Sequence, residues 1–333
     1  MTLDQLSGPG IIAFSDPAGA KAALSVAALL LHSQRTETCS LFSNRHYSFF
    51  SDWSEPVTVV PVAAALPWPQ STPRWVFTGT SHPDSSAGFE LDVIAEARLQ
   101  GVPTVSFIDH YSNYLLRFRR HGAIILPDFI WVLDEKARSE AIADGLPAQR
   151  LVIQANPYLD YIRTLWSPRL HRADILEIIH PHDNHAFRNL WLYAPDPISL
   201  RNSGEWAFDE VAALHDLIDI LKDASHTLLL VRPHPLQHLE KLESLIRAYR
   251  PERGNLVTIR SDLPGLDTAS AADCIIGFHS NFLLEAAALK RPVIRYFPAS
   301  PERDAFKHLN IGTLVHNANS LRSRLLQPIT DIR

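Results

Sequence analysis

Short apolar runs alternate along the chain with segments whose apolar residues recur at helical spacing. Runs of strand length occupy residues 10–14 and 75–78, and helical patterns follow at 20–32 and 90–100. The second helical pattern ends at Gly101, a residue type that commonly terminates helices. A strand followed by a helix, repeated, is typical of βαβ units, which build parallel sheets. The sequence therefore predicts an α/β protein.

The alternation weakens once and then resumes. Residues 157–188 are less regular, and we interpret residues 166–188 as an interdomain connection before a second series that starts at 190–193. A chain of 333 residues corresponds to about two domains. We therefore expect one Rossmann-like domain over residues 1–165 and another over residues 189–333. Open sheets of this type bind ligands at the carboxyl ends of their strands.

Composition excludes several classes of protein. Hydrophobic residues make up 46% and charged residues 20%, which excludes disorder as the main state. The net charge of −5 lacks the basic excess typical of nucleic-acid binders, so no nucleic-acid partner is expected. The longest apolar stretch, residues 18–31, is too short and too interrupted to span a membrane, and the N-terminus lacks a basic secretory start. We expect a cytoplasmic protein whose two cysteines are reduced thiols.

The segment Val-Arg-Pro-His-Pro at 231–235 is the strongest candidate for chemistry. Arg232 and His234 follow directly after the apolar strand pattern at 227–231. The prolines prevent a helix there and stiffen the turn that holds both side chains. An arginine and a histidine at the carboxyl end of a strand suit a phosphate group. The alternative is a capping arginine beside a packed histidine.

A second candidate joins a strand pattern at 274–276 to a helical pattern at 282–289. Ser280 or Asn281 is a natural N-cap of that helix. The first N–H groups of a helix, together with its dipole, form an anion site. Glu285 lies one turn further on and could accept hydrogen bonds from ribose hydroxyls. The alternative is an ordinary capped helix.

The first turn of the chain, residues 15–21, contains Asp16 and Gly19 between a strand and a helix. Such a loop can admit a ligand or a phosphate. It matches neither the dinucleotide-binding glycine motif nor the P-loop, and no Asp-x-Asp triplet occurs in the chain. The alternative is a plain Pro/Gly turn.

Candidate proton-transfer groups follow later strands of the first half. Asp109 and His110 fall at the carboxyl end of one strand, where a carboxylate could deprotonate an acceptor hydroxyl. Asp16, Asp84 and Glu90 compete with Asp109 for this role. Each of these carboxylates, taken alone, is more often a helix cap or an ion-pair partner.

Two further segments carry alternatives that we weigh against function. The run at 180–185 nearly matches the HxHxDH run of metallo-β-lactamase-like hydrolases, but Asn184 stands where that pattern needs an aspartate, so we expect a solvated linker and no metal site. The mixed aromatic and basic run at 114–120 could touch an acidic acceptor, or anionic lipid headgroups, which would place the protein peripherally at the inner membrane. The alternative for that run is an ordinary surface.

Taken together, these segments resemble bacterial glycosyltransferases of the GT-B fold. The resemblance is to the surface-polysaccharide group with "HP" and "SS" motifs, which includes polysialyltransferases, capsule Kdo transferases and CDP-glycerol glycerophosphotransferases. The His-Pro pair falls on His234 and Pro235. At the serine pair this chain has His279, Ser280 and Asn281, so one serine matches. Segments that resemble polysaccharide-cluster proteins also occur at 79–81 and 108–114.

The resemblance implies an inverting, metal-independent glycosyltransferase that needs no cofactor. It would move a sugar from a nucleotide-sugar donor on the C-terminal domain to a glycan or lipid-linked acceptor on the N-terminal domain, with Asp109 as the favoured base and Glu90 and His234 as further catalytic residues. Donor contacts are expected from Arg232, His234, Pro235, His279, Ser280, Asn281 and Glu285. Acceptor or loop contacts are expected from Asp16, Gly19, Thr80, Ser81 and His110.

Two other functions remain open from the sequence. A UDP-sugar 2-epimerase-like enzyme would share the architecture and would form a sugar isomer without any acceptor. A non-catalytic nucleotide-sugar-binding protein would bind the nucleotide and show no turnover.

Overall fold

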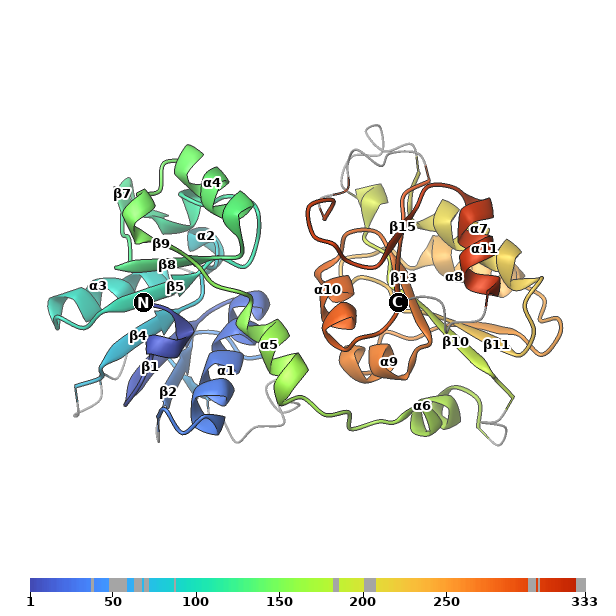
Figure 1. Cartoon of the computed structure of the whole chain (residues 1–333), viewed down its shortest axis with the longest axis horizontal. Coiled ribbons are helices and arrows are strands. Elements are labelled where there is room, and N and C mark those ends of the chain that lie inside the picture. Colours follow the sequence, from blue (N-terminus) through green and yellow to red (C-terminus); the bar gives the residue numbers. More distant parts are fainter. Residues whose placement is uncertain are drawn as a thin grey trace. The chain divides into compact units, whose positions relative to one another are not determined.

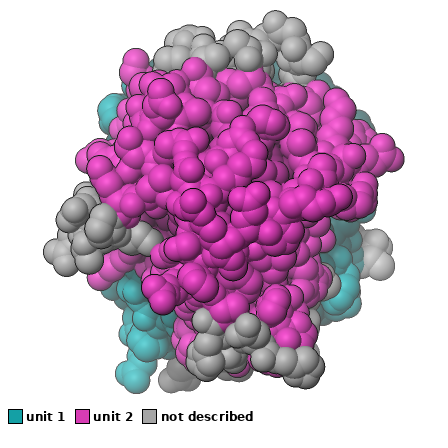
Figure 2. All heavy atoms as spheres, turned by 90° about the vertical axis from the view of Figure 1, so that its right-hand side faces the viewer, with its two compact units in different colours: residues 1–166 teal, residues 167–333 magenta. Residues whose placement is uncertain are grey.

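The chain divides into two units, residues 1–166 and 167–333, which are coloured separately in Figure 2. Each unit contains one parallel sheet with helices packed on it (Figure 1). The computed structural model describes residues 1–36, 39–47, 59–62, 68, 72–86, 88–181, 186–200, 208–298, 304 and 306–327.

The sheet of the first unit has the order β3-β2-β1-β4-β5-β8-β9, with every pair parallel. Its strands are β1 (Gly10–Phe14), β2 (Cys39–Ser43), β3 (Val59–Pro61), β4 (Trp75–Thr78), β5 (Thr104–Phe107), β8 (Phe129–Val132) and β9 (Leu151–Ile153). The chain adds β2 and β3 on one side of β1 and then returns to add β4 on the other side. The gap between β1 and β4 is therefore the point where strand order reverses, the usual place for a ligand in such sheets.

Helices cover both faces of this sheet. They are α1 (Pro17–His32), α2 (Pro83–Ser86), α3 (Phe89–Leu99), α4 (Glu135–Ala143) and α5 (Pro157–Thr164), and a short antiparallel pair, β6 (Arg119–Arg120) and β7 (Ala123–Ile124), accompanies them. Ile12 and Phe14 of β1 join a core cluster with α1, whereas Ile11 and Ala13 join another with α3. Burial on both faces explains why this strand is apolar at every position.

The sheet of the second unit has the order β12-β11-β10-β13-β14-β15 and is also parallel throughout. Its strands are β10 (Asn189–Tyr193), β11 (Thr227–Val231), β12 (Leu256–Ile259), β13 (Cys274–Gly277), β14 (Val293–Tyr296) and β15 (Thr313–Val315). Its helices are α6 (Arg172–Ile179), α7 (Glu210–Leu221), α8 (Glu240–Ala248), α9 (Gly265–Ala271), α10 (Asn281–Ala288) and α11 (Ala318–Leu326). Strand order reverses here between β10 and β13.

The prediction of an α/β fold with two parallel, Rossmann-like sheets is confirmed. The expectation that residues 157–188 are irregular differs from the structure. Residues 157–188 contain two helices, α5 and α6. Ile175 and Leu176 of α6 are buried in the core of the second unit, and α6 contacts α9. The segment 166–188 therefore contributes to the second unit's core, because its apolar residues recur on one helical face.

Candidate functional site

In the first unit, the turns that follow β1 and β4 meet at the point where strand order reverses. A Cβ atom on Gly79 would lie 2.8 Å from Glu90 Oε1 and 3.1 Å from the Cα atom of Gly19. No side chain of any size fits at Gly79 without displacing the Glu90 carboxyl group or the backbone of α1. The two glycines therefore bring the start of α1 and the turn after β4 together around Glu90.

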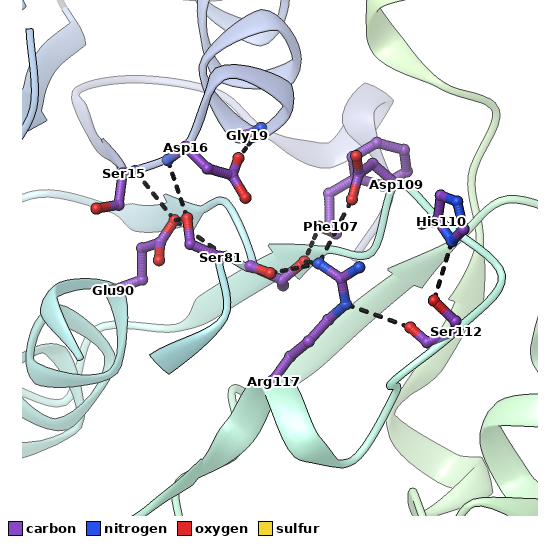
Figure 3. A network of polar contacts seen from close by, with 11 residues as sticks. Ser15, Asp16, Gly19, Ser81, Glu90, Phe107, Asp109, His110, Ser112 and Arg117 are labelled. Carbon is purple, nitrogen blue, oxygen red and sulfur yellow. Dashed lines mark hydrogen bonds and ion pairs between the residues drawn. The ribbon is translucent and has the colours of Figure 1, made fainter. Parts of the chain in front are cut away.

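Glu90 lies in the first turn of α3, and its carboxyl group is buried beneath these turns (Figure 3). Its Oε1 atom accepts hydrogen bonds from the Ser15 N–H at 3.1 Å and the Ser81 hydroxyl at 2.7 Å. Its Oε2 atom has no hydrogen-bond partner among the residues that the structure describes. Burial raises the pKa of Glu90 to about 8, although the bond from Ser81 lowers it. Glu90 can thus hold or release a proton near neutral pH.

Asp16 belongs to the same polar network. Its carboxylate caps α1 by accepting from the Gly19 N–H at 2.6 Å, and its own N–H donates to Ser81 Oγ at 3.0 Å. Burial raises the pKa of Asp16, the bond from Gly19 lowers it, and the nearby charge of Asp109 raises it further. Ser81 therefore connects the cap of α1 to the carboxyl group of Glu90.

Asp109 follows β5 and pairs with a cation. Its carboxylate lies 3.6 Å from the guanidinium of Arg117, which also donates to the Thr80 carbonyl at 2.5 Å and to the Ser112 carbonyl at 3.4 Å. His110 shares a hydrogen bond of 3.0 Å with the Ser112 hydroxyl.

Asp109 is held in an ion pair with Arg117, whereas the buried carboxyl group of Glu90 has an Oε2 atom without a partner among the described residues. The geometry therefore favours Glu90 over Asp109, the first choice from the sequence, for proton transfer. Asp84 is a weaker candidate still, because its side chain is 94% exposed.

In the second unit, Arg232 reaches from the end of β11 to α10. Its guanidinium donates to the Leu263 carbonyl at 2.7 Å and lies 5.7 Å from the centre of the Phe282 ring. Burial lowers the pKa of Arg232, and the charge of Glu285 raises it. A Cβ atom on Gly265 would lie 3.0 Å from this guanidinium, so glycine leaves room for it. Arg232 therefore lies beside the start of α10 at this edge of the sheet, and its contact with a donor stays a prediction.

The N-terminus of α10 is built as predicted, with Ser280 as the N-cap. Ser280 Oγ accepts from the Phe282 N–H at 3.3 Å. The His279 N–H donates to the carboxylate of Asp196 at 3.1 Å. Asp196 is a buried residue after β10, so it lies at the second point where strand order reverses. Sequence reasoning missed Asp196, although its position just beyond the apolar run at 190–193 was a usable signal.

The turn after β11 closes on itself. The His234 N–H donates to Gln237 Oε1 at 3.3 Å, and the Gln237 N–H donates back to the His234 carbonyl at 2.9 Å. The Leu236 N–H donates to His234 Nδ1 at 3.2 Å, while Pro235 is exposed. The contacts of His234 thus hold its ring in place. Glu285 is buried within α10, and its predicted bond to a ribose remains a prediction.

Two further expectations concern the run at 114–120 and the histidine run at 180–185. In the run at 114–120, Phe118 is buried, Arg117 binds Thr80 and Asp109, and Arg120 pairs with Asp92. Arg117 and Arg120 are therefore engaged within the first unit, whereas Arg119 is exposed, and the contact with lipid headgroups stays a prediction.

Of the histidine run, residues 182–185 lie outside the described residues. Within the described part of the chain, no group of three His, Cys, Asp or Glu side chains could hold a metal ion. None of the described helices has the length and apolarity needed to cross a membrane.

The chain is similar in fold to solved structures of proteins that act on or bind UDP-sugars. UDP-GlcNAc 2-epimerase from Neisseria meningitidis, bound to UDP-GlcNAc, matches with a TM-score of 0.66 and 11% identity, over 98% of this chain and 94% of that one. UDP-GlcNAc 2-epimerase from Methanocaldococcus jannaschii matches with a TM-score of 0.62 and 12% identity, over the same shares. Anabaena HepE in complex with UDP-glucose matches with a TM-score of 0.54 and 13% identity, over 95% and 90%.

These similarities establish the fold and correct the functional prediction. No protein-family model matches the chain, and a search of curated proteins finds no match either. The prediction of a glycosyltransferase is wrong, because several of the structures that match are UDP-GlcNAc 2-epimerases and favour the alternative of a UDP-sugar 2-epimerase-like enzyme. The short "HP" and serine motifs do not distinguish a glycosyltransferase from a UDP-sugar 2-epimerase, because a cation and a capped helix suit a phosphate in both kinds of protein.

The raised pKa of Glu90 predicts a pH-dependent stability. The folded state prefers the protonated carboxyl group of Glu90, because burial raises its pKa to about 8. The stability that depends on this protonated group is fully present below the ordinary pKa of glutamate and is lost as the pH rises from there through about 8. Replacing Glu90→Gln keeps the Oε1 acceptor and removes the ionisation. As the pH rises from 5 to 8, we expect the free energy of unfolding of this variant to increase by on the order of 3 kcal/mol relative to that of the unmodified protein.

Urea unfolding of both proteins across that pH range measures the difference. The control is Glu96→Gln on the same helix, which changes a side chain on the surface of α3. Parallel stability profiles for the unmodified protein and Glu90→Gln would show that Glu90 ionises normally in the folded state.

Proposed function

We propose that this chain binds a UDP-sugar and interconverts epimers at carbon 2 of the sugar, as a UDP-sugar 2-epimerase-like enzyme. The observation that carries the proposal is the likeness of fold, over 98% of the chain, to UDP-GlcNAc 2-epimerases. The matching Anabaena structure in complex with UDP-glucose supports the same class of ligand.

We assign the nucleotide to the carboxyl edge of the second unit, as the sequence predicted for the donor. A diphosphate carries negative charge and oxygen acceptors, so it needs cations and N–H donors. Arg232 lies against α10, whose N-terminal N–H groups follow Ser280. Such a combination of guanidinium and helix N-terminus favours phosphate at this edge.

We assign the proton transfers to the carboxyl groups of the first unit. Inversion at a sugar carbon removes a proton from one face and returns a proton to the other, so it needs groups that exchange protons near neutral pH. Glu90 has a pKa raised to about 8, and the pKa of Asp16 is raised as well. Ser81 Oγ accepts from the Asp16 N–H and donates to the Glu90 carboxyl group, which supports a shared role of the two residues.

Turnover without an acceptor tests the proposed reaction. The protein is incubated with UDP-GlcNAc in D₂O, and NMR follows the appearance of the C2 epimer and of deuterium at that carbon. We expect both signals from the unmodified protein and at least a 100-fold slower appearance from Glu90→Gln, because a general acid–base group contributes about 10²–10⁴-fold to rate.

The control in this assay is Glu96→Gln, which should turn over like the unmodified protein. Binding of UDP-GlcNAc with neither epimer nor deuterium would replace the proposal with a non-catalytic binding protein. No binding of any UDP-sugar would remove the proposal entirely.

Replacing Arg232→Met tests the assignment of the diphosphate. Hydrogen bonds between charged groups contribute about 1.5–3 kcal/mol, so the affinity for UDP should fall by about 10- to 100-fold in isothermal titration calorimetry. The matched control is Arg247→Met, because Arg247 lies on α8 and pairs with Glu243. Equal losses of affinity for UDP in both variants, or no loss in either, would contradict the assignment of the diphosphate to Arg232.

A further inference from the structure

We infer that Gln237 is a further nucleotide-binding residue, whose side-chain amide donates a hydrogen bond to an acceptor oxygen of the bound ligand. The inference rests on the proposed function and deepens it, because it adds a contact that discriminates between nucleotides. Gln237 lies in the turn between β11 and α8, five residues after Arg232. The shape of the turn, the burial of the amide and the chemistry of its neighbours carry the inference.

The turn fixes which way the Gln237 amide points. Its Oε1 atom accepts from the His234 N–H, while the Gln237 N–H donates to the His234 carbonyl. Exchanging the oxygen and nitrogen of the amide would set an NH₂ group against the His234 N–H, donor against donor. The amide nitrogen Nε2 is therefore directed away from the closed turn.

That nitrogen is a buried donor with nothing to donate to. Gln237 is 8% exposed, and its Nε2 atom is buried without an acceptor among the residues that the structure describes. Buried polar atoms in folded proteins are nearly always hydrogen-bonded, to protein, ordered water or ligand. Gln237 also lies at the edge of the sheet where ligands bind in folds of this type. A missing acceptor at this place is best supplied by the ligand.

The neighbouring groups indicate the chemistry of that acceptor. His234 Nδ1 accepts from the Leu236 N–H, so a neutral His234 ring carries its hydrogen on Nε2 and is a donor there. The Arg232 guanidinium is a donor only. Three side chains of one turn thus present hydrogen-bond donors, which suits a ligand rich in oxygen acceptors. In UDP such oxygens are the carbonyls of the uracil ring and the phosphate oxygens.

The variant Gln237→Glu tests the contact most sharply. It keeps an oxygen for the His234 N–H and replaces the donor by a second oxygen, so the turn is preserved and the contact with the ligand becomes repulsive. We expect the affinity for UDP to fall at least tenfold in isothermal titration calorimetry, with a native circular dichroism spectrum and a melting temperature that falls without ligand because the variant buries a carboxylate.

The matched control is Gln154→Glu. Gln154 is also a glutamine whose Oε1 atom accepts from a backbone N–H, that of Leu3, but it lies in the first unit. Its affinity for UDP should equal that of the unmodified protein. If Gln237→Glu melts far below the unmodified protein, Gln237→Met serves in its place, because it removes the donor without adding charge.

Titrations with UMP, UDP and CDP separate the two sources of the acceptor oxygen. If the amide binds the uracil ring, Gln237→Glu loses affinity for UMP and UDP but keeps or gains affinity for CDP, whose amino group can donate to the new carboxylate. If the amide binds the phosphates, UDP and CDP lose affinity by equal factors. Either outcome supports the inference.

Unchanged affinity for all three nucleotides in Gln237→Glu, or in Gln237→Met where the first variant does not fold, overturns the inference and leaves the proposed function standing. Failure of the unmodified protein to bind any of these nucleotides overturns the proposed function and the inference together. The two failures are distinguishable, because only the second is visible in the unmodified protein.

Discussion

The parallel course of every strand in both main sheets is the constraint on which the sites depend. Because all strands of a sheet run the same way, each one delivers the residues that follow it to the same edge. In the first unit this edge receives Asp16 and Asp109, and in the second it receives Asp196 and Arg232. Helices cover both faces of each sheet, so the strand interiors are apolar and polar chemistry is confined to the strand ends.

The two edges differ in the groups that they leave for a ligand. The first unit gathers carboxyl groups, and burial rather than a neighbouring charge is the main cause of the raised pKa of Glu90 and Asp16. The second unit gathers donors, and Arg232 remains beside the buried carboxylate of Glu285. An anionic diphosphate suits donors, and a sugar carbon exchanges protons only with the help of an acid–base group. The proposed function assigns each of these chemistries to the unit whose residues carry it.

Sequence reasoning predicted the fold well and the site in part. Alternating strand and helix patterns are local signals, and they placed the sheets and the strand ends that carry Arg232, Ser280 and Asp109. The ranking of Glu90 over Asp109 needed tertiary information, because the ion pair with Arg117 and the burial of Glu90 arise only when distant turns meet. The motifs could not decide between a transferase and an epimerase, because a turn that suits a phosphate serves both kinds of enzyme.

Glu90 and Gln237 show why burial adds information that residue type lacks. Glutamate and glutamine are ordinary surface residues, and the sequence offered Glu90 only as one of several candidate carboxylates. Each becomes distinctive because the protein uses one polar atom of the side chain to secure it and buries the other: Ser15 and Ser81 hold Glu90 Oε1, and His234 holds Gln237 Oε1. The second atom, Oε2 or Nε2, then has no partner among the described residues. A side chain whose orientation is fixed by one hydrogen-bonded atom can present its second atom to a ligand without changing conformation. In both proposed roles one atom of the side chain is structural and the other acts on the ligand: Glu90 transfers a proton and Gln237 donates a hydrogen bond.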